Sequence, residues 1–548
     1  MKKFFLSILT LAALCLSASA QKVAYKILHE TDSTLKVSLS GITLSSRGAH
    51  KIVYEYPSKD ADGKAVTISG VILIPSDIYE GSTPCDGVIM YNHPTIGNPS
   101  QAPSQGDLEG PGAMLANPLR PNYIIVMSDY IGYGSSIDHK ICYLAGETNA
   151  RNSLDGLLAA RQLFTDRSIP QGKYLFNVGY SQGGTESMYA AKLRDMEYKD
   201  KGITFDKTFV GGGMLDCEKA YEEFVKKDAC DAINDVAMFL ISVNENFHVG
   251  IDYKELFQEP LASHVDEVIK TKDKGVLGKI GVSDIDSLHK LLTPAYMNLE
   301  SDQFKALKAK LAEIKISNGW EPDVTQHYYM EHSRHDSYVP IQCARSLMTW
   351  MSERGFTRSL VPGKTNLQTC TLVFKLKHQQ SGIVWAIQTM AAIQFWPVLY
   401  YEGEQNRYYH AVVKDLDVIK VLQTLEKLGL DVRKLVKGSS APEQRSNRVN
   451  IGPLLGLIPG VSDALAKVDL TTDDLSEMIE DAGITETDII RVVGYLFSPS
   501  APEKSELTMD SILEEASAPL YLQKMYEQML SDWFKLRGHD VHYEQWAW

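Results

Sequence analysis

Ser181 has a glycine two residues before it and a glycine two residues after it, in the hexapeptide Gly179-Tyr180-Ser181-Gln182-Gly183-Gly184. The pattern G-x-S-x-G is typical of a nucleophile elbow, a tight strand-to-helix turn whose flanking glycines let strand and helix approach closely. Residues 174–178 before it predict a short buried strand, and residues 185–194 after it predict a helix with small, apolar residues. Because chance produces this pattern in about one chain in five of this length, Ser181 needs partners to count as a nucleophile.

A serine hydroxyl becomes a good nucleophile only when a base removes its proton and an acid orients that base. Two side chains follow Ser181 in the order that this chemistry uses, acid first and histidine second. Asp336 comes after a predicted strand at 324–330, and His378 comes after a predicted strand at 371–377. We therefore expect Asp336 to orient His378, and His378 to act as the general base.

Other roles for these residues stay open at the level of sequence. Asp216, after the preceding predicted strand, is a rival acid, and Asp336 could instead cap the next helix. His378 could be an exposed loop residue. The cluster of His332, His335 and Asp336 could bind a metal, although no further ligands follow at a recognisable spacing. The competing histidines lie within a predicted strand or beyond the predicted sheet: His327, His410, His539 and His542.

The negative charge that develops during acyl transfer needs two preorganised donors. One is expected to be the backbone N–H of Gln182, directly after the serine. The second is expected in the loop at 91–97, where Pro94 has no N–H and the donor falls to Thr95, with Ile96 behind it. The alternative for this loop is a rigid turn that only ends a strand.

The chain of 548 residues and 61.0 kDa predicts two or three domains. Its formal net charge is −14, and no basic run follows a pattern suited to a phosphate backbone. We therefore expect no nucleic-acid partner, and repulsion from anionic membranes. No apolar run after the N-terminal segment reaches the roughly 18 residues that span a bilayer, so the mature chain is expected to have no integral membrane segment.

The first twenty residues have the three parts of a secretory signal peptide. Two lysines precede an apolar run at 4–16, and Ala-Ser-Ala at 18–20 precedes Gln21, the expected first residue of the mature chain. This predicts a secreted or periplasmic protein. Cys15 raises a lipoprotein anchor as the alternative, but the residue before it is a bulky leucine.

Six cysteines remain after this segment, and an exported protein can oxidise them. Their pairing cannot be deduced from the sequence, because six cysteines allow fifteen full pairings. Cys217 and Cys230 could close a short disulfide loop, and buried free thiols are the equal alternative. The six are Cys85, Cys142, Cys217, Cys230, Cys343 and Cys370.

Strand and helix patterns alternate along the first part of the chain, which predicts a mostly parallel sheet with helices on both faces. An antiparallel hairpin at 50–75 precedes it. The further elements before residue 216 are strands at 86–91, 123–128 and 207–210 and a helix at 149–164. The expected division is a signal peptide at 1–20, an α/β core at 21–216, a helical insertion at 217–318, the rest of the core at 319–400, including a helix at 381–395, and a helical module at 401–548.

Together these motifs resemble the secretory lipase group of the α/β-hydrolase superfamily, over roughly residues 45 to 400. The segments that carry the resemblance are NHPT at 92–95, DYIGYG at 129–134, GYSQGG at 179–184, HSRHDSYVP at 332–340 and KHQQSG at 377–382. Cutinases share only the elbow and are much shorter. The chain departs from the family at Pro94, where a glycine is more usual, and beyond residue 401, where no counterpart is recognised.

The resemblance implies an extracellular carboxylic-ester hydrolase with a helical cap and a triad of Ser181, Asp336 and His378. It also implies that the loop at 129–134 lines the site, the alternative being a plain glycine-rich turn. We therefore expect a secreted serine esterase that needs no cofactor or metal and acts on a small-molecule, lipid or carbohydrate ester. A serine peptidase and a catalytically silent binding module on the same fold are the alternatives, and the oligomeric state stays open.

Overall fold

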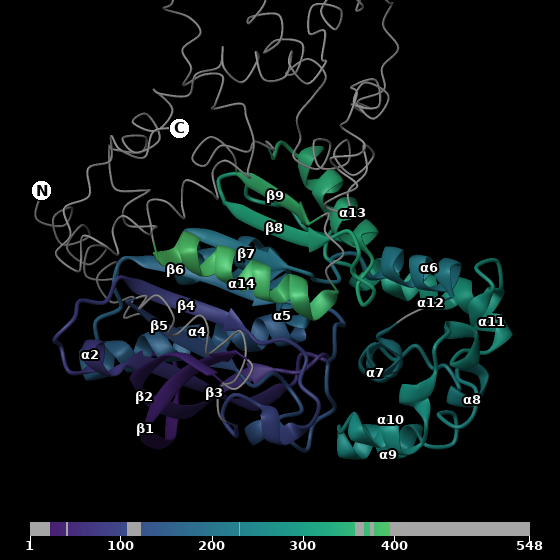
Figure 1. Cartoon of the computed structure of the whole chain (residues 1–548), viewed down its shortest axis with the longest axis horizontal. Helices are drawn as coiled ribbons and strands as arrows, with labels where there is room; N and C mark the ends of the chain where they lie inside the picture. Colours follow the sequence, from purple (N-terminus) through teal and green to yellow (C-terminus); the bar gives the residue numbers. More distant parts are fainter. Residues whose placement is uncertain are drawn as a thin grey trace, which may run out of the picture.

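The computed structural model describes residues 22–39, 42–106, 122–228, 231–356, 366–372 and 377–394. The predicted signal peptide and the predicted helical module at 401–548 lie outside these ranges. Within them, helices cover both faces of one mixed β-sheet, and a further group of helices lies beyond one end of its strands (Figure 1).

Nine strands form this sheet in the order β1-β2-β3-β5-β4-β6-β7-β8-β9. Neighbours are antiparallel from β1 to β5 and parallel from there to β9, which confirms the prediction of a mostly parallel sheet. The strands are β1 Lys26–Leu39, β2 Ile42–Lys59, β3 Ala65–Pro75, β4 Gly87–Asn92, β5 Tyr123–Ser128, β6 Tyr174–Tyr180, β7 Lys207–Gly211, β8 Tyr328–Ser333 and β9 Leu367–Leu372.

The helices of the core form two layers, with α4 and α5 on one face of the sheet and α14 across the other (Figure 1). Within the described ranges, none of the helices has both the length and the apolar character that crossing a bilayer requires. The helices are α2 Ser76–Tyr79, α4 Thr148–Arg167, α5 Gln182–Leu193, α6 Cys217–Lys227, α7 Ile233–Asn246, α8 Tyr253–Leu256, α9 Val265–Thr271, α10 Gly275–Lys279, α11 Pro294–Met297, α12 Asp302–Ile314, α13 Ile341–Ser352 and α14 His378–Gln394.

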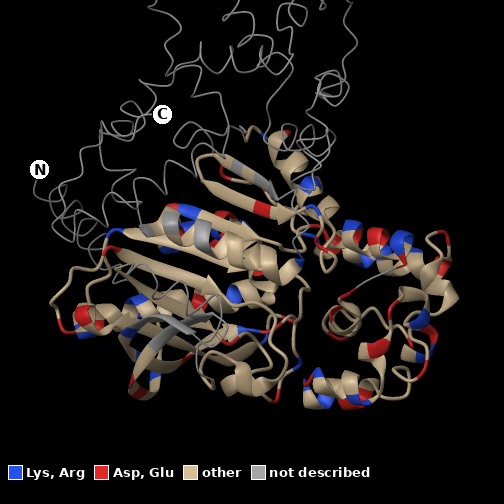
Figure 2. Cartoon of the chain, viewed as in Figure 1, with Lys and Arg blue, Asp and Glu red and all other residues tan. Residues whose placement is uncertain are grey.

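The central strands are buried on both faces because successive side chains point to opposite layers. In β4, Val88 and Met90 pack in the layer that holds α4 and α5, whereas Ile89 and Tyr91 pack in the layer under α14. Charged residues accordingly gather on the helices and loops, and the strands carry few of them (Figure 2). This sandwich holds the carboxyl ends of the parallel strands rigidly at one edge.

Helices α6 to α12 occupy the predicted insertion between β7 and β8 and lie beyond the ends toward which the parallel strands point (Figure 1). We call residues 217–314 of this group the cap. Its apolar side chains, such as Phe239 and Leu311, are continuous with the core layer that contains α4 and α5. The cap and the core therefore share one hydrophobic core, in addition to being joined by the chain.

Two predicted strands are placed wrongly. The strand expected at 324–330 is β8, and it begins only at Tyr328, because the carboxylate of Asp323 accepts hydrogen bonds from the backbone N and Oγ1 of Thr325 and closes a turn there. The strand expected at 371–377 is β9, which spans Leu367–Leu372 and so begins four residues earlier than expected, while residues 373–376 lie outside the described ranges. The following helix begins at His378 itself rather than at residue 381.

Four cysteines are free thiols in this structure: Cys85, Cys142, Cys217 and Cys343. The last three are buried. The disulfide considered between Cys217 and Cys230 is therefore absent, and Cys217 instead donates through Sγ to the backbone O of Leu311. Cys230 and the side chain of Cys370 lie outside the described residues.

The elbow contacts the end of β4 through backbone atoms alone. A Cβ added to Gly183 would lie 2.0 Å from the backbone O of Asn92, and one added to Gly179 would lie 2.1 Å from the backbone O of Gly183. Real Cβ atoms do not approach so closely. Both glycines of the motif are thus required by packing, which explains their spacing around Ser181.

We predict that Gly183→Ala lowers the free energy of unfolding by about 1–3 kcal/mol or more, because backbone cannot move aside as a side chain can. Gly278→Ala in α10 is the matched control, since its nearest neighbour would be Ser283 Oγ at 3.4 Å. That variant should be neutral or more stable, as alanine is the better helix former. Urea unfolding of both variants measures the difference, and equal stabilities would contradict the contact.

Candidate active site

The elbow holds Ser181 in a strained backbone conformation, with φ 58° and ψ −122°. Positive φ at a residue with a Cβ costs on the order of 1–3 kcal/mol and persists only where the surroundings impose it. Here β6 ends at Tyr180, α5 begins at Gln182, and the backbone N of Ser181 donates to the backbone O of Gly211 at 2.8 Å. The strain projects Oγ away from the sheet.

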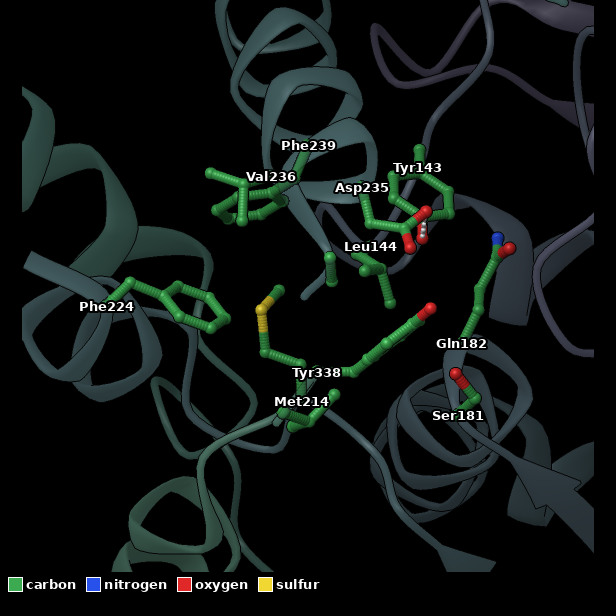
Figure 3. A pocket seen from close by; sticks show the side chains of 12 residues that line it. Tyr143, Leu144, Ser181, Gln182, Met214, Phe224, Asp235, Val236, Phe239 and Tyr338 are labelled. Carbon is green, nitrogen blue, oxygen red and sulfur yellow. Dashed lines mark hydrogen bonds between the residues drawn. The ribbon is translucent and has the colours of Figure 1, made fainter. Parts of the chain in front are cut away.

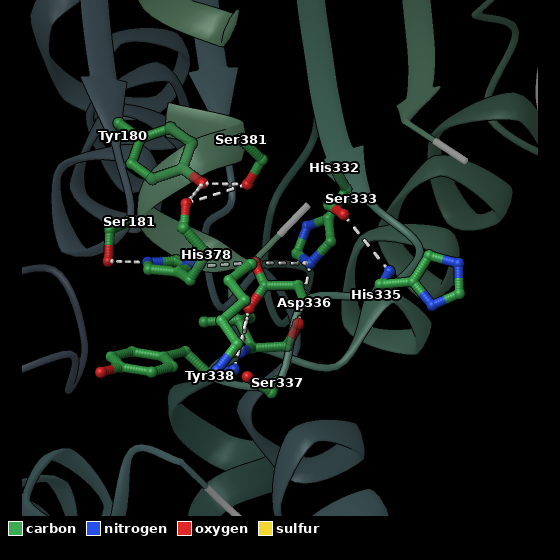
Figure 4. A network of polar contacts seen from close by, with 12 residues as sticks. Tyr180, Ser181, His332, Ser333, His335, Asp336, Ser337, Tyr338, His378 and Ser381 are labelled. Atoms are coloured by element: carbon green, nitrogen blue, oxygen red, sulfur yellow. Dashed lines mark hydrogen bonds and ion pairs between the residues drawn. The ribbon is translucent and has the colours of Figure 1, made fainter. Parts of the chain in front are cut away.

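The structure brings Ser181, His378 and Asp336 together in one hydrogen-bonded chain (Figure 4). Ser181 Oγ lies 2.8 Å from His378 Nε2, and His378 Nδ1 lies 2.6 Å from Asp336 Oδ2. Because a carboxylate only accepts, Nδ1 carries the proton and Nε2 is free to accept from the serine hydroxyl. This is the tautomer in which histidine can act as a base toward Ser181.

Asp336 is held as a carboxylate acceptor by the turn that follows β8. Its Oδ1 accepts from the backbone N of Tyr338 and of Val339, each at 2.9 Å. Burial raises the pKa of Asp336, but the hydrogen bond from His378 and the nearby histidine charges outweigh burial, and the pKa falls below its ordinary value. The group is therefore ionised at neutral pH and can stabilise an imidazolium.

Two tyrosines hold the His378 ring from both sides. The Tyr338 ring lies parallel to it at 6°, with centroids 5.1 Å apart, and the Tyr180 ring is tilted at the same centroid distance. Tyr180 Oη also donates to the backbone O of His378 at 2.6 Å. Since Tyr180 directly precedes Ser181, the strand that carries the serine also positions the histidine.

The rival acid does not reach this histidine. Asp216 caps α6 by accepting from the backbone N of Lys219 at 3.0 Å, and its other oxygen accepts from Ser346 Oγ at 2.6 Å. His327 is exposed and directly precedes β8, whereas Asp336 follows the other end of that strand. The remaining three competing histidines lie outside the described residues.

The histidine and aspartate cluster at the end of β8 does not converge on one point. His332 is buried, with Nε2 2.9 Å from the backbone O of Val339, whereas His335 is exposed and its ring points away from Asp336 (Figure 4). No group of three potential metal ligands occurs among the residues that the structure describes.

The loop after β4 lies at the elbow, as the prediction for Thr95 requires. The backbone carbonyls of Asn92 and His93 face Gly183, and Gln182 is the buried first residue of α5. The hydroxyl of Thr95 lies 2.9 Å from Tyr143 Oη. The loop that carries Thr95 thus begins beside Gln182, where the two N–H donors expected to bind a negatively charged oxygen must lie.

Ile96 and the loop at 129–134 support this arrangement from behind. Ile96 packs against an apolar cluster that contains Tyr130. Tyr130 stacks on the His93 ring at 4.0 Å between centroids and donates to the backbone O of His93 at 3.1 Å. The residues that line the described cavity include none from 129–134, and Tyr130 of this loop supports His93 instead.

A small cavity lies beside Ser181, between the core and the cap (Figure 3). Its volume is ≈ 30 Å³. Most of its walls are apolar, and Asp235 is the charged exception. The lining residues are Tyr143, Leu144, Ser181, Gln182, Met214, Phe224, Ala232, Asp235, Val236, Phe239, Tyr338 and Val339.

Comparison with known proteins identifies the fold. No protein-family model matches the chain, and no curated protein matches it. A proposed hydrolase from Legionella pneumophila is 19% identical, covering 70% of this chain and 99% of its own, with a TM-score of 0.55. The rice cell wall degrading esterase LipA from Xanthomonas oryzae is 17% identical, covering 69% of this chain and 99% of its own, with a TM-score of 0.53. The chain therefore has the α/β-hydrolase fold, as its motifs predicted.

Sequence reasoning missed the residues that surround the hydrogen-bonded chain. Tyr338 had a usable signal, because it lies two residues after Asp336 within the motif that carries the resemblance. Asp235 and Tyr143 had none, since each comes from a segment without a motif and the two meet only in the folded protein. Glu186 was hidden in a helix of small residues, one turn after Gln182.

Glu186 is a buried carboxyl directly below the elbow. Its Oε1 accepts from Asn149 Nδ2 at 3.1 Å, while its Oε2 has no hydrogen-bond partner among the described residues. Burial raises the pKa of Glu186 to about 8, against smaller lowering contributions from Asn149 and Gln182. The group is therefore largely protonated at neutral pH.

We predict that Glu186→Gln becomes increasingly more stable than the wild type as pH rises from 5 to 8. In this window the folded chain keeps a proton that the unfolded chain releases, so the stability of the wild type falls with rising pH, whereas glutamine cannot titrate. Since 1 kcal/mol corresponds to about 2–4 °C, the Tm advantage should widen by about 4 °C or more.

Differential scanning calorimetry at pH 5 and pH 8 measures this change in Tm. The exposed Glu353→Gln is the matched control for loss of one carboxylate. A Tm difference that stays constant between the two pH values would contradict the protonated state of Glu186.

Proposed function

We propose that this chain is a secreted serine hydrolase that cleaves carboxylic esters through an acyl-enzyme on Ser181. The observation that carries the proposal is the continuous hydrogen-bonded chain from Ser181 through His378 to Asp336, at a strained elbow beside a cavity. Secretion rests on the signal-peptide pattern of residues 1–20.

In the proposed reaction, His378 Nε2 takes the proton of Ser181 Oγ as the oxygen attacks the ester carbonyl. The imidazolium that forms is stabilised by Asp336, whose pKa is held low. The carbonyl oxygen gains negative charge and is bound by the backbone N–H groups of Gln182 and Thr95. The same Nε2 proton then passes to the alcohol oxygen, which leaves as the free alcohol.

Water then hydrolyses the acyl-enzyme by the same two proton transfers, with water in place of Ser181 as the nucleophile. His378 takes a proton from water as it attacks the acyl carbonyl of Ser181, and returns that proton to Oγ as the acid product departs. Each step uses groups that the chain itself supplies, so the proposal needs no cofactor or metal. The α/β-hydrolase fold supports many chemistries, and the esterase name of the Xanthomonas relative agrees with this one by analogy of fold.

We predict that Ser181→Ala lowers kcat by a factor of about 10³ or more while leaving the Tm unchanged within about 2 °C, as removal of a triad member does. A fluorophosphonate probe should add its mass to the peptide that contains Ser181 in the wild type and not in the variant.

Ser187, buried in the same helix, is the control serine. Ser187→Ala should keep the labelling at Ser181, although it removes the hydrogen bond that Asn92 Nδ2 donates to Ser187 Oγ. Labelling of another serine, or full activity of Ser181→Ala, would mean that Ser181 is not the nucleophile.

The cavity predicts a preference for short acyl groups. A buried water molecule needs about 10–15 Å³ of cavity volume, so ≈ 30 Å³ holds roughly two or three groups of that size. On a series of nitrophenyl esters from acetate to palmitate, kcat/KM should be highest at about two to four carbons. Phe224→Ala should shift the optimum toward longer chains, because Phe224 forms one apolar wall.

Phe304→Ala is the matched control, since Phe304 is also a buried phenylalanine of the cap but stacks on Tyr221 and does not line the cavity. It should leave the chain-length optimum in place. A wild-type optimum at palmitate would contradict the short-acyl prediction, and faster turnover of aminoacyl amides than of all esters would favour a peptidase.

A further inference from the structure

The cap contacts the active-site segment at 141–144 along one face of α7. The backbone N of Tyr143 donates to Ser242 Oγ at 2.7 Å, and Asn246 Nδ2 donates to the backbone O of Ile141 at 2.8 Å. Asp235 lies further toward the N-terminus of the same helix and reaches the cavity. Residues of α7 therefore bind Tyr143 at two places: Ser242 binds its backbone N, and Asp235 binds its side-chain hydroxyl.

A chain of polar contacts runs from the cap to the loop that carries Thr95, and Figure 3 shows its central pair, Tyr143 and Asp235. Tyr143 Oη lies 2.9 Å from Thr95 Oγ1 and donates to Asp235 Oδ1 at 3.0 Å. Lys274 Nζ donates to the same Asp235 oxygen and lies 5.2 Å above the Tyr143 ring. The backbone N of Lys274 donates to the backbone O of Gly97, two residues after Thr95, at 2.8 Å.

The direction of these hydrogen bonds follows from the number of protons. Tyr143 has one hydroxyl proton, and an ionised carboxylate is a stronger acceptor than a neutral hydroxyl. The Tyr143 proton therefore goes to Asp235 Oδ1, which also accepts from Lys274 Nζ. Thr95 must then donate its only hydroxyl proton to Tyr143 Oη, and that hydroxyl cannot also donate to a substrate oxygen.

We propose that Tyr143, Asp235 and Lys274 are positioning residues through which the cap holds Thr95, so that Thr95 acts on the carbonyl oxygen through its backbone N–H alone. This inference rests on the proposed ester hydrolysis at Ser181 and deepens it. The cap thereby completes the oxyanion hole in addition to shaping the cavity. Misplacement of a reacting group by about 1 Å can cost about a hundredfold in rate, so loss of this hold should affect turnover more than binding.

We expect Tyr143→Phe to lower kcat by about ten- to a hundredfold, with KM within about threefold of the wild type, on acetate and butyrate esters alike. Tyr253→Phe is the matched control, because it removes a tyrosine hydroxyl that donates to a cap carboxylate, Glu245, at 2.7 Å and does not line the cavity. It should leave both kcat and KM unchanged.

Thr95→Val tests the assignment of the proton. It removes the hydroxyl and keeps the backbone N–H, so it should lower kcat as much as Tyr143→Phe, and the double variant should lose no more than either single variant. Thr95→Ser keeps the hydroxyl and should retain most of the activity. If Thr95→Val alone costs a hundredfold or more while Tyr143→Phe costs nothing, the hydroxyl itself is the donor and the inference is wrong.

Lys274→Met extends the test to the cap. It should lower kcat as Tyr143→Phe does, whereas Lys272→Met, which removes the neighbouring lysine that donates to the backbone O of Ile137, should not. Equal losses for both lysines would indicate general loosening of the cap, and a change in KM for polar esters alone would indicate a substrate contact. Either result overturns the positioning role, whereas a wild-type protein that hydrolyses no ester overturns the proposed function as well.

Discussion

The site depends on one contact that only glycine permits, the approach of the elbow to the end of β4. Because Gly183 has no Cβ, the backbone O of Asn92 can lie where that atom would be. This brings the first turn of α5 against the loop that holds Thr95, and the two proposed donors come from these two segments. The same close packing, with the bond from the Ser181 backbone to Gly211, offsets the strain at φ 58°.

A second consequence of the elbow is that the position of His378 is fixed relative to Ser181, by the strand that carries the serine. Tyr180, the last residue of β6, supports the His378 ring and binds its backbone O, while Asp336 and Tyr338 approach from the turn after β8. Small shifts of α14 relative to the sheet are therefore opposed at both the ring and the backbone. The distance between Nε2 and Oγ is held by packing as well as by its own hydrogen bond.

The parts of the site that sequence reasoning found are those encoded by short segments. Ser181 and Gln182 follow from a local motif, and Asp336 and His378 follow from strand order, even though the strands were misplaced by several residues. Sheet order and the strand-end rule tolerate such errors, because Asp336 still follows β8 and His378 still follows β9. Asp235 and Tyr143 could not be found in this way: they are 92 residues apart, and nothing in either segment encodes their meeting.

The cap's two roles constrain each other. Val236 and Phe239 of α7 line the cavity, so a substrate too large for it would have to move α7 away from the core. That movement would separate Asp235 from Tyr143 and release the Thr95 hydroxyl, since these contacts cross the same boundary. Under the proposed positioning role, opening the cap for a large substrate weakens the oxyanion hole that must stabilise its reaction. Short acyl groups avoid this conflict, because they fit while the cap stays closed and Thr95 stays held.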